Sequence, residues 1–244
     1  MFRHQGKSRT ARHNLQIASV LSFVAGIVNV AGFLAVHQLT TNVTGHFAFF
    51  VDAVFQLDYG QALLFLAFVF CFLFGSFAST FIIEAVSQRS KINSYIVPVT
   101  LEIFILCAIA LFGKFLMEEN PNVVVFSLLF AMGLQNALVT KISSATVRTT
   151  HLTGLFTDLG IEIAQLFFYK QPEIRTKLLT SVKLRLTIIS FFFIGGITSG
   201  LFYQKIQLTV LFIAGCTLFF GLIFDNMKHK ILKLNRKIHP EKQS

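Results

Sequence analysis

Carboxylates stand inside two short, otherwise apolar stretches of this chain. Asp158 and Glu162 are four positions apart, so a helix would place both on one face. Asp52 lies in a similar stretch earlier in the chain. An ionised side chain at the centre of a membrane helix costs about 2.5–3.5 kcal/mol, so these groups are expected to face a protein interior or a water-filled cavity. There they would carry a coupling proton or bind a cation. The alternative is headgroup water, with pairing to Arg148 or Lys170.

A short polar motif opens each of these two stretches. It reads Asn42-Val43-Thr44-Gly45 in one copy and His151-Leu152-Thr153-Gly154 in the other, and each copy follows an apolar segment with Gly-x-x-Asn. A break before a helix frees backbone groups that suit ions or polar solutes, although a single copy would be an ordinary helix cap. Buried amides in these segments can also bond helix to helix. The duplication predicts a substrate- or ion-binding site made of Asn29, Asn42, Thr44, Gly45, Asp52, Gln135, Asn136, His151, Thr153, Gly154, Asp158 and Glu162.

The composition indicates that much of the chain is surrounded by lipid. Of its 244 residues, 54% are hydrophobic and 13% are charged, against about 25% charged in soluble domains. The apolar runs are continuous rather than alternating, which favours helices over strands. We therefore expect an all-α polytopic membrane protein.

Six apolar segments are long enough to cross a bilayer as helices, and two are shorter. The long ones are 15–37, 60–84, 93–117, 122–141, 184–204 and 207–226. The short ones, 43–57 and 152–169, carry the motif and the acids. This pattern predicts one membrane domain of two related repeats, 15–117 and 118–226, between a basic N-terminus (1–14) and a basic tail (227–244). The segments 75–79 and 196–200 both carry small residues four positions apart, so we align them and expect both to be helix-packing faces.

The charges of the loops bear on whether the short segments cross. If all eight segments cross, the loop with Arg89 lies outside and the loop with Glu118 inside, against the positive-inside tendency. If the two short segments are re-entrant, both loops change sides and the basic cluster 170–185 stays inside with both termini. Each repeat then has three crossings, which makes the two repeats inverted, as in many secondary transporters.

Several classes of function lack support in the sequence. We find no catalytic motif, no metal-ligand spacing and no cofactor signature, and the three cysteines (Cys71, Cys107 and Cys216) each lie in an apolar run. The net charge of +10 is confined to loops and ends, where it favours anionic lipid over nucleic acid. A homo-oligomer is left open.

The first motif also carries a family resemblance. Phe23-Val24-Ala25-Gly26 with Asn29, then Gly32-Phe33 and the segment 42–45, resembles the YoaK-like bacterial membrane proteins (domain of unknown function 1275), and the likeness extends over about 15–226. The resemblance implies a multi-pass protein of the bacterial inner (cytoplasmic) membrane, loosely described as a permease, and brings no substrate or catalytic residue. It also leads us to expect Asp where this chain has Asn29.

Three functions remain after these observations. The favoured one is a secondary transporter or permease of a small polar or ionic solute, with its site between the repeats at the paired Thr-Gly breaks. The second is a non-transporting scaffold or sensor that acts through its basic loops. The third is an intramembrane enzyme acting on lipid or quinone, although the chain shows no enzyme motif.

Overall fold

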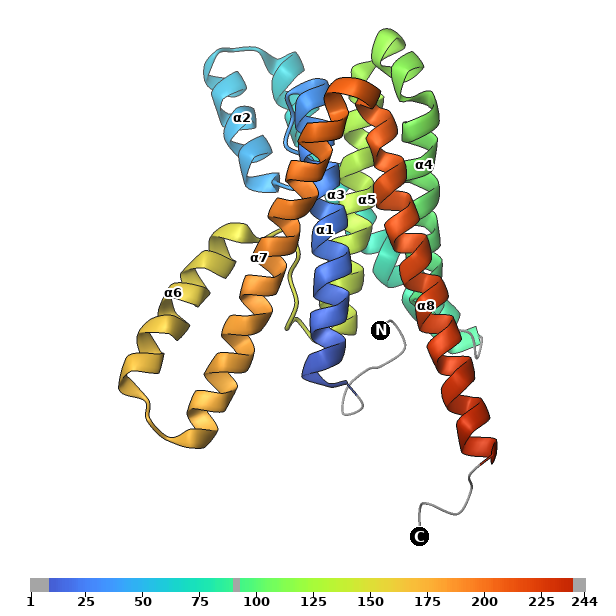
Figure 1. The fold of residues 1–244 in the computed structure, drawn as a ribbon. Coiled ribbons are helices and arrows are strands. Elements are labelled where there is room, and N and C mark those ends of the chain that lie inside the picture. The colour runs from blue at the N-terminus through green and yellow to red at the C-terminus, as the bar shows by residue number, and fades with distance from the viewer. Residues whose placement is uncertain (1–8, 90–92, 239–244) are drawn as a thin grey trace.

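The computed structural model describes residues 9–89 and 93–238, and every regular element in them is helical (Figure 1). In chain order the elements are α1 (Ala11–Val36), α2 (Val43–Phe55), α3 (Tyr59–Arg89), α4 (Ile96–Glu119), α5 (Pro121–Ile142), α6 (Leu152–Phe168), α7 (Pro172–Ile206), the 3₁₀ turn η2 (Gln207–Val210) and α8 (Leu211–Ile238). The prediction of an all-helical membrane protein is confirmed.

In the described part of the chain, five helical stretches are long and apolar enough to cross a membrane, judged by length and composition. They are α1, α3, α4, α5 and the stretch Pro172–Asp225, which contains α7, η2 and the first half of α8. Within that last stretch α7 and α8 run in opposite directions (Figure 1). Large apolar side chains such as Phe74, Phe77 and Phe81 are exposed on these helices. Exposed aromatic bulk of this kind fits a surface in contact with lipid.

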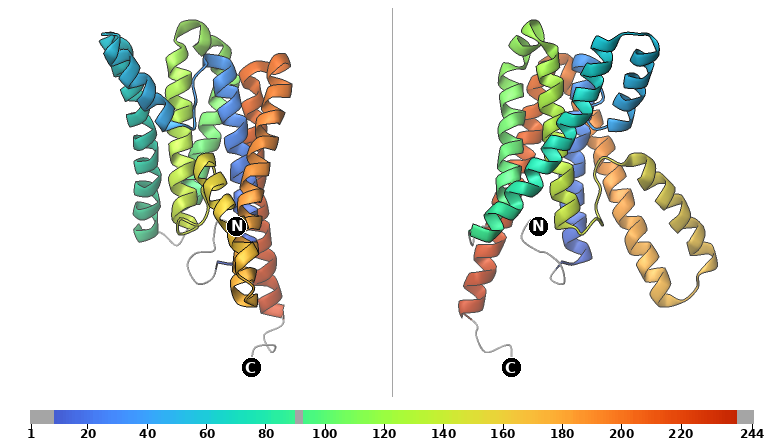
Figure 2. Two further views of the ribbon diagram at one scale, coloured as in Figure 1. Left: turned by 90° about the vertical axis from the view of Figure 1, so that its left-hand side faces the viewer. Right: turned by 180° about the vertical axis from the view of Figure 1, so that it is seen from behind.

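The helices form a bundle in which partners are distant in sequence. α1 packs mainly against α7, and α5 packs mainly against α3. α4 packs against α5 and α8, while α8 also contacts α1 (Figure 2). The two short helices are attached to the outside of this bundle, α2 on α3 and α6 on α7.

Glycines allow the backbones of α1 and α7 to touch. A Cβ added to Gly26 would lie 2.0 Å from the carbonyl oxygen of Phe192, and one added to Gly195 would lie 2.1 Å from that of Phe23. Any other residue at either position would force the two backbones apart, because real Cβ atoms do not approach a backbone oxygen so closely. Contacts of this type replace the hydrophobic drive that lipid does not supply.

The pair α5 and α3 makes the same contact. A Cβ on Gly133 would lie 2.2 Å from the oxygen of Phe72, and one on Gly75 would lie 2.2 Å from that of Phe130. Gly75 therefore occupies on α3 the place of Gly195 on α7. The sequence alignment had set Gly75 against Gly196, so it was wrong by one residue: α7 has two adjacent glycines, and only packing distinguishes them.

Both short helices begin near the middle of the molecule. After α1, the segment 37–42 turns back into the bundle, and α2 then runs to the end that the chain had just reached (Figure 1). The segment 143–151 and α6 do the same after α5, at the opposite end. Residues in the left-handed region start both reversals, His37 at φ 52° and Ser144 at φ 51°.

Both short helices fall short of the about 20 residues that usually cross a membrane. α2 has 13 residues and α6 has 17. Their lengths are therefore about 20 and 26 Å, against a hydrocarbon core of about 30 Å. Their bounds agree closely with the predicted segments 43–57 and 152–169.

The predicted bounds of the last two long segments were wrong at one end each. The basic cluster 170–185 was taken as a loop, but α7 begins at Pro172 and includes nearly all of it. Similarly, α8 continues past residue 226 to Ile238. Hydropathy marks where a helix leaves lipid and not where it ends, and Pro172 in the first turn is a favourable start.

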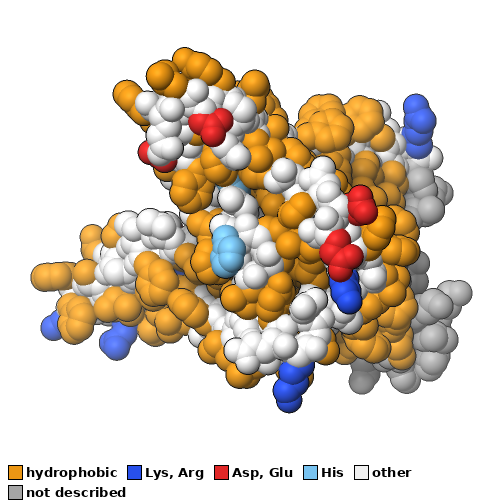
Figure 3. All heavy atoms as spheres, turned by 90° about the horizontal axis from the view of Figure 1, so that it is seen from above, with side chains coloured by type: hydrophobic (Ala, Val, Ile, Leu, Met, Phe, Trp, Pro, Cys, Tyr) orange, Lys and Arg blue, Asp and Glu red, His pale blue; other side chains and the backbone are white. Residues whose placement is uncertain are grey.

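Basic residues outnumber acidic residues at one end of the bundle, whereas the other end holds both kinds, with Lys114 and Lys205 among them. One end holds the start of α1, the ends of α3, α5 and α8 and the α6–α7 turn, where Arg89, Lys141 and Arg175 lie; we call it the basic end. The opposite end holds Asp58, Glu118 and Glu119 at the ends of α2 and α4. Figure 3 shows the molecule from this opposite end, where a few charged side chains lie among broad hydrophobic surfaces.

Candidate functional site

Both copies of the Thr-Gly motif line one cavity of about 590 Å³. Its walls come from α1, α3, α7 and the two segments that precede α2 and α6. Six of the predicted site residues are among its lining: Asn29, Asn42, Thr44, His151, Thr153 and Gly154. Apolar side chains such as Phe72, Leu73 and Phe192 complete it. Segments that are remote in sequence thus meet at a single cavity.

Hydrogen bonds hold the first segment against α1. The Thr41 hydroxyl donates to Oδ1 of Asn29 at 2.7 Å, and the Thr40 hydroxyl donates to the carbonyl oxygen of Val28 at 3.1 Å. The Gly45 N–H then donates to Oδ1 of Asn42 at 3.2 Å, which caps α2. Asn42 and Gly45 therefore have the ordinary capping role that the sequence left open. Gly45 is not among the residues lining the cavity.

The second segment is held against α5 in a similar way. The Thr150 hydroxyl donates to Oδ1 of Asn136 at 2.9 Å. Nε2 of Gln135 donates to the carbonyl oxygen of Leu21 at 3.1 Å and to the Thr149 hydroxyl at 3.3 Å. Asn136 and Gln135 therefore fix the reversal and the contact with α1, and neither lines the cavity. His151 makes no capping bond to α6.

Sequence reasoning missed the threonines that complete this arrangement. Thr41 and Thr150 both line the cavity and both bond the asparagine of the preceding helix. A signal was present, because a Thr-Thr pair precedes the motif in both copies, at Thr40-Thr41 and Thr149-Thr150. In each pair the first threonine is fully buried and the second faces the cavity.

The electrostatics of the cavity come from its backbone. Asp, Glu, Lys and Arg are absent from the described residues that line it, and the polar lining consists of amides, hydroxyls and His151. The first turns of α2 and α6 both line the cavity. The N-terminus of a helix carries a partial positive charge and unpaired N–H groups. The cavity thus offers hydrogen-bond donors and acceptors between apolar walls.

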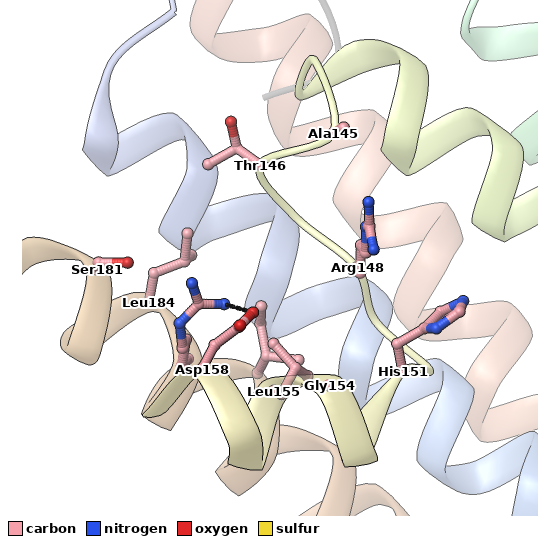
Figure 4. Close-up of a pocket in the computed structure, with 11 residues that line it drawn as sticks. Ala145, Thr146, Arg148, His151, Gly154, Leu155, Asp158, Ser181 and Leu184 are labelled. Carbon is pink, nitrogen blue, oxygen red and sulfur yellow. Dashed lines mark ion pairs between the residues drawn. The ribbon is translucent and has the colours of Figure 1, made fainter. Parts of the chain in front are cut away.

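The two acids of α6 lie beside this cavity, bound to an arginine of α7. Nε of Arg185 is 2.8 Å from Oε2 of Glu162, and its Nη2 donates to Oε1 at 2.8 Å. Its Nη1 is 3.0 Å from Oδ2 of Asp158 (Figure 4). The Ser181 hydroxyl also donates to Glu162, at 2.6 Å. The expected partners Arg148 and Lys170 were wrong, because α7 extends further than predicted and brings Arg185 alongside α6.

A second cavity, of about 310 Å³, surrounds this ion-pair cluster. Arg148, Asp158 and Arg185 line it, together with His151 and Gly154, which also line the first cavity (Figure 4). Asp158 is half exposed here, whereas Glu162 is only 12% exposed. We refer to the 590 Å³ space as the central cavity and to this one as the vestibule.

Asp52 does not join the other predicted acids. It is exposed on α2 and accepts a hydrogen bond from Nε2 of Gln56 at 2.8 Å. Because α2 and α6 start together and diverge to opposite ends, their later residues cannot share a site (Figure 1). Glu102 on α4 is fully buried and lines neither cavity.

Metal chemistry has no candidate in the part of the chain that the structure describes. Among the residues whose side chains the structure describes, no three His, Cys, Asp or Glu are grouped so that they could hold an ion. The three cysteines are free thiols.

These observations define a class: a multi-pass helical membrane protein with two short helices that begin at a polar cavity. The chain matches the family model described as "Protein of unknown function (DUF1275)" over residues 17–224, and it belongs to that family. It is 25% identical over 193 residues to the UPF0700 transmembrane protein YoaK of Bacillus subtilis (strain 168). The aligned residues cover 78% of this chain and 84% of YoaK. No solved structure matches it.

Proposed function

We propose that the protein is a secondary transporter of a small polar or ionic solute, and that the central cavity is its binding site. The observation that carries this proposal is the meeting of two interrupted segments, from distant parts of the chain, at one polar cavity of about 590 Å³. Discontinuous helices that meet inside the bilayer are the usual construction of a transport site.

An architecture of two inverted repeats, α1–α4 and α5–α8, underlies the proposal. Six helices would cross the membrane, and α2 and α6 would be re-entrant. Three paired observations support the repeats. Gly26 and Gly133 make matching glycine contacts, and Asn29 and Asn136 accept matching hydrogen bonds from a threonine. Each short helix also packs against the next long helix in the chain. Each repeat packs its first helix against the third helix of the other, so the halves interlock.

The distribution of charge supports an orientation in the membrane. The basic end would face the cytoplasm of a bacterial inner membrane, with both termini on that side. Arg89, Lys141 and Arg175 would then be cytoplasmic, and Glu118 and Glu119 would lie outside.

A matched pair of glycine variants tests the function. An added Cβ meets nothing within 4 Å at Gly154 or at Gly160, and both lie on α6, but only Gly154 lines the cavities. Gly154→Trp should fill the passage, whereas Gly160→Trp should leave it open. The measurement is uptake of a panel of small polar and ionic solutes into proteoliposomes.

The expected result is uptake of at least one solute by wild type and by Gly160→Trp, and its loss in Gly154→Trp. Equal uptake by the two variants would exclude the central cavity as the path. A panel that gives no uptake above protein-free vesicles would favour the scaffold function over transport.

A further inference from the structure

The central cavity and the vestibule adjoin each other. Both are lined by His151 and Gly154, so they meet at the start of α6. From there the vestibule lies between α6 and α7, which are joined by a turn at the basic end (Figure 1). Arg148, Asp158 and Arg185 line it, and charged side chains with exposed surface keep such a space hydrated.

The matching place in the other half is found by register. Setting Thr44-Gly45 against Thr153-Gly154 places Phe49 opposite Asp158. Setting Gly75 against Gly195, as their contacts require, places Phe65 opposite Arg185. The positions that form the ion pair between α6 and α7 are thus occupied by two phenylalanines between α2 and α3.

These phenylalanines are in contact, as the charged residues are. The ring centroids of Phe49 and Phe65 are 5.4 Å apart, whereas Nη1 of Arg185 is 3.0 Å from Asp158. The same junction between a short and a long helix is therefore made twice, once with aromatic side chains and once with ions. This agreement was not used to set the register, so it is independent support for it.

Further aromatic rings extend the contact into the bundle. His46 lies 5.3 Å from Phe68 and 6.4 Å from Phe65, and Phe68 lies 4.8 Å from Phe126, between ring centroids. His46 and Phe68 are fully buried, and Nε2 of His46 is bonded to the carbonyl oxygen of Leu39 at 2.8 Å. We call His46, Phe49, Phe65, Phe68 and Phe126 the aromatic cluster. The packing around the two buried members, His46 and Phe68, leaves no room for water.

We infer that solute reaches the central cavity from the basic end through the vestibule, and that the aromatic cluster is the closed gate toward the opposite end. The gate opens when α2 moves away from α3. This inference rests on the proposed transport function and adds the side from which the solute enters. Its test needs no solute, so route and transport can fail separately.

The route is tested by the accessibility of a single thiol in the central cavity. In a background with Cys71, Cys107 and Cys216 replaced by Ala, Thr44→Cys is exposed to a charged, membrane-impermeant methanethiosulfonate from each side of sealed vesicles. Gln171→Cys and Tyr59→Cys identify the sides, because they lie at the basic end and at the opposite end.

The expected result is modification of Thr44→Cys from the Gln171 side alone. Modification from the Tyr59 side alone, from both sides or from neither would overturn the inferred route. Adding Gly154→Trp should abolish labelling from the Gln171 side, and adding Gly160→Trp should leave it unchanged. Equal labelling with the two tryptophans would also overturn it.

The gate is tested by removing one ring at a time. Phe65→Ala and, separately, Phe49→Ala should make Thr44→Cys reactive from the Tyr59 side as well. Phe49 is partly exposed, so its variant keeps a folded protein available if Phe65→Ala does not express. Phe81→Ala, at an exposed position of α3 outside the cluster, is the control and should add no reactivity. If neither gate variant adds reactivity from the Tyr59 side, the aromatic cluster is not the barrier.

Discussion

Replacing Arg185 should destabilise the protein more than replacing either of its acidic partners. Arg185→Met keeps an unbranched apolar stem and removes the guanidinium group. Glu162 is then left as a carboxylate that is 12% exposed, with only the Ser181 hydroxyl as a partner. Leaving a buried charge unpaired costs about 3–5 kcal/mol. Because the hydrogen bond from Ser181 to Glu162 remains, we expect the free energy of unfolding to fall by about 3 kcal/mol, the lower limit.

The loss for Asp158 should be much smaller. Its side chain is 51% exposed, so water replaces the arginine, and Asp158→Asn should cost at most about 1 kcal/mol, as for a surface ion pair. Lys183→Met is the matched control on the same helix, because Lys183 is exposed and makes no ion pair among the described residues. It should cause no measurable loss.

Thermal unfolding of purified protein in detergent, followed by size-exclusion chromatography of heated samples, measures these differences. If a chain of this size responds like a soluble domain, Arg185→Met lowers the midpoint by about 6–12 °C and Asp158→Asn by less than about 4 °C. A loss for Asp158→Asn as large as that for Arg185→Met would refute the reasoning from exposure.

The other half of the chain suggests a rescue. In the proposed repeat, Phe49, Ala53 and Phe65 correspond to Asp158, Glu162 and Arg185. The triple variant Asp158→Phe, Glu162→Ala, Arg185→Phe should therefore recover much of the stability that Arg185→Met loses, because buried ion pairs are often replaceable by packed apolar groups. A triple variant less stable than Arg185→Met would show that the two junctions are not equivalent.

Three further predictions concern single positions and use the same unfolding assay. Gly26→Ala should lower the free energy of unfolding by about 1–3 kcal/mol, because the new Cβ would lie 2.0 Å from a backbone oxygen. Gly160→Ala, with open space around the new Cβ, should raise it by up to about 1 kcal/mol. Thr41→Val should cost about 1 kcal/mol through the lost bond to Asn29, and equal stability would show that this bond does not hold the reversal. Glu102→Gln should leave the midpoint unchanged, because Oε1 of Glu102 is buried without a hydrogen-bond partner, and a large loss would reveal an interaction of the carboxylate.

Local composition was sufficient to predict the helices and six of the residues that line the central cavity. Apolar runs place a chain in lipid, and lipid admits only helices or closed barrels, so the helical class followed directly. The starts of α2 and α6 followed from Asn42 and His151, which precede the two short apolar stretches. Asn29 was singled out as an amide in an apolar run, and it does reach the cavity.

Contacts between distant segments were beyond the reach of the sequence. Asp52 and Asp158 occupy similar places in the chain, but their helices diverge from the central cavity toward opposite ends, so Asp158 lines the vestibule and Asp52 does not. Arg185 looked like one basic residue of a loop, and it became the partner of Glu162 because α7 begins earlier than hydropathy indicates.

What this chain determined by itself was its solvent, its helices and the two places where the helical path is interrupted, because each of these depends on neighbouring residues. What only the tertiary structure decided was which of those places meet, which glycine touches which carbonyl, and which junction is ionic and which aromatic. Such pairings depend on helices packing across more than a hundred residues of chain, as Gly26 does with Phe192, and no local pattern records that distance.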